Sequence, residues 1–349
     1  MAVDEIIVGG KSLGMRRAVI NPNFGSKNVL TSNAWEYIEL WLRRNAAKTD
    51  APFFWQQAQA FYHSSVGLPV TASPLSLYYC FLNATKALLS AKSVNFASHH
   101  GLSGAGNAGK SSLANEIVKL KGGGVHFALR QYLREDVSLK SYSLKDILYN
   151  LAFVHRAYCL SYSEGELFIP VDNCRYVCGK GVTEAWVTGD ADDCFNDKRV
   201  LATLPDTFER DVGFPEKLVI RKRQRFKWRK GQQQKASNER RLANYHGKLR
   251  QDITYIAGVG QWYIKRRLAS ATIIDRHTTT LIFAAMHRLS ELCRYDPLRL
   301  SRLMDSQRNW LLSEFIRMSA VQFIDEIACE ITGQEINVPG IHGGSFLSA

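Results

Sequence analysis

The chain has 349 residues, of which 46% are hydrophobic and 22% are charged, a composition typical of a globular protein. It has no apolar run long enough to span a bilayer and no N-terminal charged-then-apolar signal, and its seven cysteines do not suggest a disulfide framework. These features exclude membrane-spanning and disulfide-stapled classes and lead us to expect a cytoplasmic protein with one large or two to three smaller domains.

The first 150 residues predict mainly helices. The clearest helix begins at Ser73 and Pro74, with serine as the N-cap and proline in the first turn. The predicted helices cover 33–44, 53–62, 73–91, 127–133 and 143–152, with a loop from 92 to 112 and a strand at 116–119.

The pattern changes to short β-like runs between about Ser161 and Leu268 and returns to helices after that. The β-like runs are 166–170, 175–177, 185–187, 218–230 and 262–265, and the later helices are 278–294, 298–318 and 321–331. We therefore expect an N-terminal helical region over 1–155, a basic β-rich insertion over 156–270, and C-terminal helices over 271–349 that complete one bundle.

Positive charge is concentrated in one segment, Lys217 to Arg250. The chain carries a formal charge of +13, and this segment holds 13 basic residues and a single acidic residue, Glu239. Like charges this close repel one another unless a polyanion binds them, so the segment predicts a nucleic-acid-binding surface. A solvated arm or a protein-docking arm is the alternative interpretation.

The run from Leu218 to Lys230 has β-branched and aromatic residues without proline, which favours one strand. Alternation along a strand places the basic side chains on one face and an apolar-rich set, including Phe226 and Trp228, on the other. The predicted nucleic-acid-binding residues are Arg221, Arg223, Arg225, Lys227, Arg229 and Lys230. The polar stretch 231–237 is expected to form the tip of a hairpin.

A second motif runs from Gly104 to Ser111 and matches the phosphate-loop pattern G-x-x-x-x-G-K-[ST]. It makes Gly104, Gly109, Lys110 and Ser111 candidate nucleotide-binding residues, with ATP or GTP and Mg²⁺ as the implied cofactors; otherwise no cofactor is expected. The preceding residues are too polar for the buried strand that such a loop follows, so a flexible loop is the alternative.

Two further sequence patterns are less specific. Arg241 and His246 form an R-x4-H pair that could stabilise a phosphate transition state and move a proton in metal-independent RNA cleavage. A chance occurrence of this pair is the alternative interpretation, because arginines are abundant in the basic segment.

The set His155, Cys159, Cys174, Cys178 and Cys194 lacks a C-x-x-C pair, so we expect buried reduced cysteines and no metal site.

Several stretches resemble known families. The residues 73–89 and His99-His-Gly-Leu102 resemble the signature of HEPN-like helical domains and, more closely, the YaaC-like family of bacterial proteins. The resemblance continues at 124–129, 142–148 and 155–158 and resumes over 281–297. It implies an α+β protein built on a mainly helical HEPN-like bundle, with the basic β-rich segment as an insertion.

The resemblance also bears on function. HEPN-like proteins include ribonucleases and non-catalytic RNA-binding members, and the nucleases place R-x4–6-H on a late helix, which the helix over 278–294 lacks. We therefore expect a DNA- or RNA-binding protein in bacterial antiphage defence or a stress response, with ribonuclease and nucleotide-binding activities as alternatives. We further expect a homodimer and a partner protein of a defence system, and we expect no association with a membrane.

Overall fold

The computed structural model describes residues 3–106, 111–269, 272–305 and 309–338. The chain divides into two compact units. Unit 1 comprises residues 1–28, 166–271 and 333–335, and unit 2 comprises 29–165, 272–332 and 336–349. Among the described residues, every helix is too short or too polar to cross a membrane.

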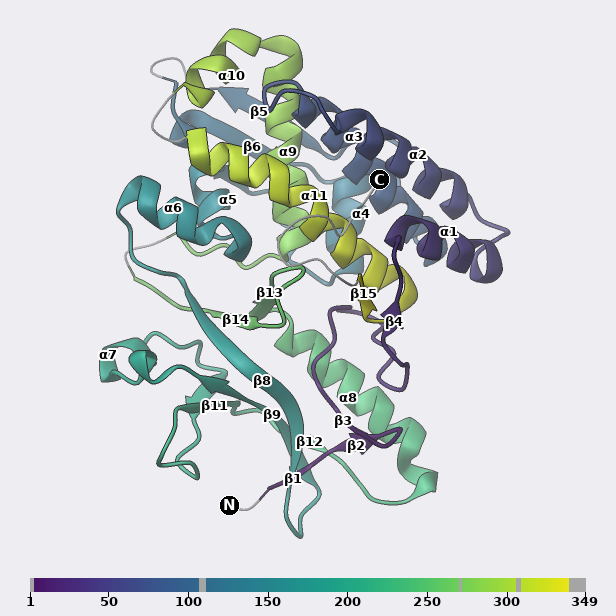
Figure 1. Ribbon diagram of the computed structural model, residues 1–349, viewed down its shortest axis with the longest axis vertical. Helices are drawn as coiled ribbons and strands as arrows, with labels where there is room; N and C mark the ends of the chain where they lie inside the picture. The colour runs from purple at the N-terminus through teal and green to yellow at the C-terminus, as the bar shows by residue number, and fades with distance from the viewer. Residues whose placement is uncertain (1–2, 107–110, 270–271, 306–308, 339–349) are drawn as a thin grey trace. The chain divides into compact units, whose positions relative to one another are not determined.

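Unit 2 is built mainly of helices. Their bounds are α1 (Ala34–Asn45), α2 (Ala51–Ser65), α3 (Ser73–Ala91), α4 (Val125–Tyr132), α5 (Leu144–Tyr149), α6 (His155–Tyr162), α9 (Thr278–Tyr295), α10 (Pro297–Met304) and α11 (Asn309–Thr332). Helix α3 packs against α2, α9 and α11 (Figure 1). Phe81 of α3 stacks on Phe323 of α11 with ring centroids 4.3 Å apart, and both rings are fully buried.

Local capping explains where several of these helices begin. The Asn33 side chain accepts hydrogen bonds from the backbone of Trp35 and Glu36 at the start of α1. The Ser143 hydroxyl accepts from the amide of Asp146, as its sequence position predicts. Ser73 is the first residue of α3 rather than its cap, because the cap position is Ala72.

Unit 2 also contains two small sheets. One is antiparallel, in the order β5 (Leu102–Gly106), β6 (Glu116–Leu120) and β7 (Ser141–Ser143), and β5 and β6 pack on α9. The other pairs β4 (Val29–Leu30) in parallel with β15 (Ile336–Asn337). Strand β6 was predicted, whereas β5 occupies part of the segment predicted as a loop.

Unit 1 is built on an eight-stranded antiparallel sheet. The strands run in the order β10 (Phe208–Arg210), β11 (Val219–Lys222), β9 (Glu184–Ala191), β8 (Phe168–Gly179), β14 (Trp262–Lys265) and β13 (Ile253–Tyr255), with β1 (Val3–Glu5) on β8 and β12 (Phe226–Lys227) on β9. The shorter elements are β2 (Ile7–Val8), β3 (Lys11–Ser12) and α7 (Lys198–Leu201).

One face of this sheet packs against α8 (Lys235–Leu249). Leu242, Tyr245 and Leu249 of α8 join a buried apolar cluster with side chains from the sheet, among them Tyr176 and Phe226. Unit 1 therefore has a hydrophobic core of its own, and α8 forms one side of it.

The expected mainly helical HEPN-like bundle is wrong. The structure is α+β, with 45% helix and 19% strand, and its large sheet is a principal element rather than an appendage. The predicted helices over 298–318 and 321–331 are also wrong, because α10 ends at Met304 and α11 runs unbroken from Asn309 to Thr332. The segment 231–237 is no hairpin tip, since its last residues begin α8.

Candidate functional site

The predicted basic strand is interrupted. Strand β11 pairs with β9 up to Arg221 opposite Thr188, and β12 resumes with Phe226 opposite Ala185. Between these two pairs the basic segment advances by five residues while β9 advances by three. The basic segment therefore contains two extra residues, which bulge out of the strand ladder. Because two is an even number, side-chain alternation is preserved and Ile220 and Phe226 both reach the core.

The first half of the predicted basic face is occupied by intramolecular ion pairs. Arg221 donates from Nε to Glu209 at 2.8 Å and from Nη1 to Asp211 at 3.3 Å. Its side chain is 19% exposed, whereas that of Arg223 is 61% exposed and reaches Glu209 only at 3.7 Å. Arg221 is therefore neutralised inside the protein.

Arg225 is also engaged. Its guanidinium lies 4.4 Å from the ring centroid of Trp186 and donates to Glu184 at 3.1 Å. This cation–π contact helps to cover an indole that is almost completely buried. Arg225 therefore has a structural role through its contacts with Trp186 and Glu184.

The second half of the segment remains exposed. Lys227, Arg229 and Lys230 are all at the surface, and within the described part of the chain none of their side chains is paired with a carboxylate. The backbone of Arg229 is fixed, because its amide donates to Asn238 and its carbonyl accepts from the same side chain. Asn238 thus ties the exposed cations to the first turns of α8.

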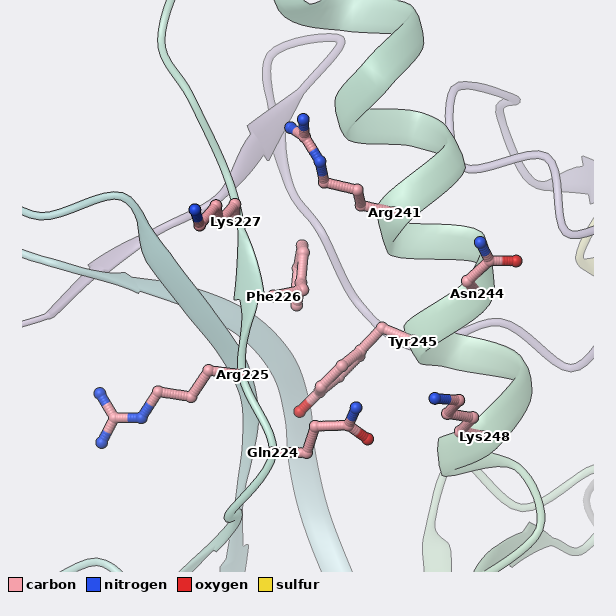
Figure 2. A pocket seen from close by; sticks show the side chains of 8 residues that line it. All are labelled: Gln224, Arg225, Phe226, Lys227, Arg241, Asn244, Tyr245 and Lys248. Atoms are coloured by element: carbon pink, nitrogen blue, oxygen red, sulfur yellow. The ribbon is translucent and has the colours of Figure 1, made fainter.

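A pocket of about 240 Å³ lies beside this segment, between β12 and α8. Figure 2 shows Phe226 and Tyr245 projecting between strand and helix, with Gln224 and Lys248 on one side of them and Arg241 on the other. The lining residues are Gln224, Arg225, Phe226, Lys227, Arg241, Asn244, Tyr245 and Lys248. This lining combines cations, amides and aromatic rings and includes no carboxylate.

Helical spacing produces the α8 side of the pocket. Arg241, Asn244, Tyr245 and Lys248 are related as i, i+3, i+4 and i+7, so they share one face. The Tyr245 hydroxyl accepts a hydrogen bond from the amide of Val187 at 3.1 Å, which anchors its ring against the sheet. Sequence reasoning missed Asn244, Tyr245 and Lys248, although this spacing was the signal for them.

The R-x4-H pair is divided between two faces of α8. Five residues correspond to a rotation of about 500°, so Arg241 and His246 point about 140° apart. His246 is fully buried; its Nε2–H donates to the carbonyl of Ala18 at 2.9 Å, and its Nδ1 accepts from the hydroxyl of Tyr176 at 2.6 Å. Burial, reinforced by nearby Arg250, lowers the pKa of His246 to about 3. The structure therefore does not bring Arg241 and His246 together as an acid–base pair.

The phosphate-loop pattern has a different local setting. Gly104 lies in β5, and its amide donates to Glu291 at 3.0 Å. Gly109 and Lys110 lie outside the described residues, and Ser111 precedes a short 3₁₀ turn and the antiparallel strand β6. The described setting is thus strand, turn and antiparallel strand, rather than the strand, loop and helix of a phosphate loop.

The five soft metal-ligand candidates are distributed over both units. His155 and Cys159 lie on α6 of unit 2, with Cys159 Sγ 3.3 Å from His155 Nε2. Cys174, Cys178 and Cys194 belong to unit 1, where Cys174 and Cys178 pack against its apolar cluster. Across the described ranges, no three His, Cys, Asp or Glu side chains are grouped as metal ligands.

One comparison with known proteins gave a match. The sequence profile of the YaaC-like protein family matches residues 23–331. No curated protein and no solved structure matches the chain.

Proposed function

The chain belongs to the YaaC-like protein family, and we propose that it binds nucleic acid through the exposed half of its basic segment and the adjacent α8 pocket. We call this surface the basic groove. It consists of Lys227, Arg229, Lys230, Arg241 and Lys248, together with the amide and aromatic side chains of the pocket.

The observation that carries the proposal is that no acidic residue lines the described pocket. The exposed cations next to the pocket form no ion pair with a carboxylate of the described residues. Unit 1 as a whole has 25 Lys and Arg against 16 Asp and Glu. Glu209 and Asp211 neutralise Arg221, and Glu184 neutralises Arg225. Among the described residues none of these three acids pairs with a cation of the groove. Uncompensated charge of this kind suits a chain of phosphates.

The amides and rings give the groove features beyond charge. Gln224 and Asn244 can each donate and accept hydrogen bonds, and the phosphate backbone and base edges offer partners for both. Phe226 is packed in the core, so it forms a wall rather than a free stacking platform. We therefore expect phosphate contacts to supply most of the affinity.

The test compares two triple variants by fluorescence anisotropy at one salt concentration. Lys227→Gln/Arg229→Gln/Lys230→Gln removes three groove charges, and Lys27→Gln/Lys198→Gln/Arg199→Gln removes three exposed charges of unit 1 outside the groove. We expect the first variant to lose at least about tenfold in affinity for single-stranded DNA, duplex DNA or RNA, and the second to lose much less.

Equal losses in both variants would show only a general effect of net charge and would contradict the proposal. Poly-glutamate serves as a competitor that distinguishes an acidic protein partner. If it displaces nucleic acid at equal charge concentration, the groove binds polyanions without preference for phosphate. A role in antiphage defence or stress remains a prediction about the context of this binding.

A further inference from the structure

The pocket between β12 and α8 has an apolar wall that phosphate binding alone does not use. The rings of Phe226 and Tyr245 form this wall, with centroids 4.7 Å apart and planes inclined by 41°. The two residues are only 9% and 4% exposed, so packing fixes the rings in place. A hydrated phosphate gains little from such a surface, whereas a flat heterocyclic ring gains from contact with it.

The sheet sets the position of the Tyr245 ring. Its hydroxyl accepts from the amide of Val187 at 3.1 Å, so the polar end of the side chain is engaged there. The buried ammonium of Lys222 lies 6.0 Å from the centroid of the same ring and is paired with Asp252 at 3.6 Å. The ring, rather than the hydroxyl, is therefore what Tyr245 offers to the pocket.

Two side-chain amides flank this wall, one from each element. Gln224 lies in the bulged stretch between β11 and β12, and Asn244 lies on α8 (Figure 2). Both are exposed, and neither side chain forms a hydrogen bond with another described residue. Asn238 of the same helix differs, because it is buried and binds the backbone of Arg229. The two pocket amides are therefore available to a ligand.

The chemistry of these amides matches the edge of a nucleobase. Each amide carries hydrogen-bond donors and an acceptor, and a base edge carries the same mixture, whereas phosphate oxygens only accept. In an intact duplex the Watson–Crick edge is already paired, but in a single strand it is free. An amide pair beside an apolar wall therefore suits an unpaired base better than a phosphate or a paired base.

The size of the pocket and its surrounding charge fit one nucleotide of a chain. Its volume of about 240 Å³ is below that of pockets for drug-sized ligands, about 300–1,000 Å³, so it suits a single ring system. Lys248 lies towards one end, and Arg241 and Lys227 lie towards the other (Figure 2). A nucleotide with its base on the ring wall would thus have cations near the phosphates on both sides.

We propose that this pocket holds one unpaired nucleobase of a single-stranded segment, an inference that rests on the proposed nucleic-acid binding and specifies what the groove recognises. The base lies against Phe226 and Tyr245, and the amides of Gln224 and Asn244 bind its edge. Phosphate contacts still supply most of the affinity, and the base contact supplies the preference for an unpaired strand. An intact duplex reaches only the cations, because extruding a base costs its pairing and stacking energy.

The test measures binding of the full-length protein to two fluorescent strands of equal length by anisotropy. One is oligothymidylate, whose bases are unpaired, and the other is the same deoxyribose-phosphate chain without bases. Because both strands carry the same charge, their difference isolates the contribution of the bases. We expect the wild type to bind oligothymidylate at least about tenfold more tightly than the abasic strand.

A matched pair of double variants assigns this preference to the pocket. Gln224→Ala/Asn244→Ala should reduce the affinity ratio to about threefold or less, because the hydrogen bonds to the base edge are lost. Asn21→Ala/Asn196→Ala removes two exposed amides of unit 1 outside the pocket and should keep the wild-type ratio. All four side chains are exposed, so both variants are expected to fold.

Equal binding of the two strands by the wild type would overturn the inference. A ratio that persists in the Gln224 and Asn244 variant would place the base elsewhere and would overturn it as well. Failure of the proposed function gives a different result, because Lys227→Gln/Arg229→Gln/Lys230→Gln would then bind both strands as tightly as the wild type. If that variant loses affinity for both strands while the wild type does not distinguish them, the groove binds phosphates and the pocket takes no base.

Discussion

The hydroxyl of Tyr176 donates to Nδ1 of His246 across 2.6 Å, joining the central strand β8 to helix α8. Since Nε2 of the same ring donates to Ala18, both nitrogens are used inside unit 1. His246 therefore links the sheet, the helix and the N-terminal segment inside the core. Because both of its nitrogens are used there, it is not available for the acid–base catalysis that the R-x4-H pattern suggested.

Burial of neutral His246 predicts a specific loss of acid stability. Its folded pKa of about 3 lies below the unfolded value of about 6.5, so the unfolded state binds the proton first. The stabilisation is present above pH 6.5 and is lost as the pH falls towards 3. This group alone should reduce the free energy of unfolding by about 2 kcal/mol between pH 7 and pH 5.

Urea unfolding at a series of pH values, read by tryptophan fluorescence, measures this effect. His246→Gln should lower stability at pH 7 but flatten the pH dependence. His63→Gln, which changes an exposed histidine of α2, is the control and should leave the profile unchanged. An unaltered slope in the His246 variant would refute the assignment.

Arg221 and Arg223 are two residues apart but should behave differently. Arg221→Gln leaves Asp211, whose side chain is 6% exposed, without its guanidinium, and should cost about 1–2 kcal/mol. Arg223→Gln removes an exposed, longer contact and should cost less than about 0.5 kcal/mol. Thermal unfolding of both variants measures the difference, and equal changes would contradict the ion-pair assignment.

Gly104 should be intolerant of a side chain for reasons unrelated to nucleotide binding. A Cβ at this position would overlap Glu291 and Arg288, so Gly104→Ala should destabilise the protein by about 1–3 kcal/mol. Gly165→Ala is the matched control, because a Cβ at Gly165 would meet open space and the φ of this residue is not positive. A Gly104 variant as stable as this control would show that β5 does not pack on the charge network of α9.

The elements that could be predicted are those with local signals. Asn33 and Ser143 mark the starts of α1 and α5, and the apolar spacing of α3 is clear over its whole length. Alternation also predicted which side of the basic segment would pack, because a two-residue loop leaves the facing of Ile220 and Phe226 unchanged.

The elements that were missed depend on distant residues. Helix α8 is rich in basic and polar side chains, so its charge obscured the helical spacing of Leu242, Tyr245 and Leu249, which pack against the sheet. Strand β5 contains two glycines, which have low strand propensity. They are needed because a Cβ at these positions would overlap the side chains of Glu291 and Arg299. The division of the basic segment into paired and unpaired cations depends on Glu184, Glu209 and Asp211, whose proximity the sequence could not reveal.

The salt dependence of nucleic-acid binding tests the central claim most directly. Affinity of the wild-type protein for a duplex should fall linearly in a plot of log K against log salt concentration, because each phosphate contact releases counterions. Lys227→Gln/Arg229→Gln/Lys230→Gln should reduce the magnitude of that slope by about 2 to 3, whereas Lys27→Gln/Lys198→Gln/Arg199→Gln should leave it nearly unchanged. The same slope for wild type and both variants would contradict a basic groove that binds phosphates.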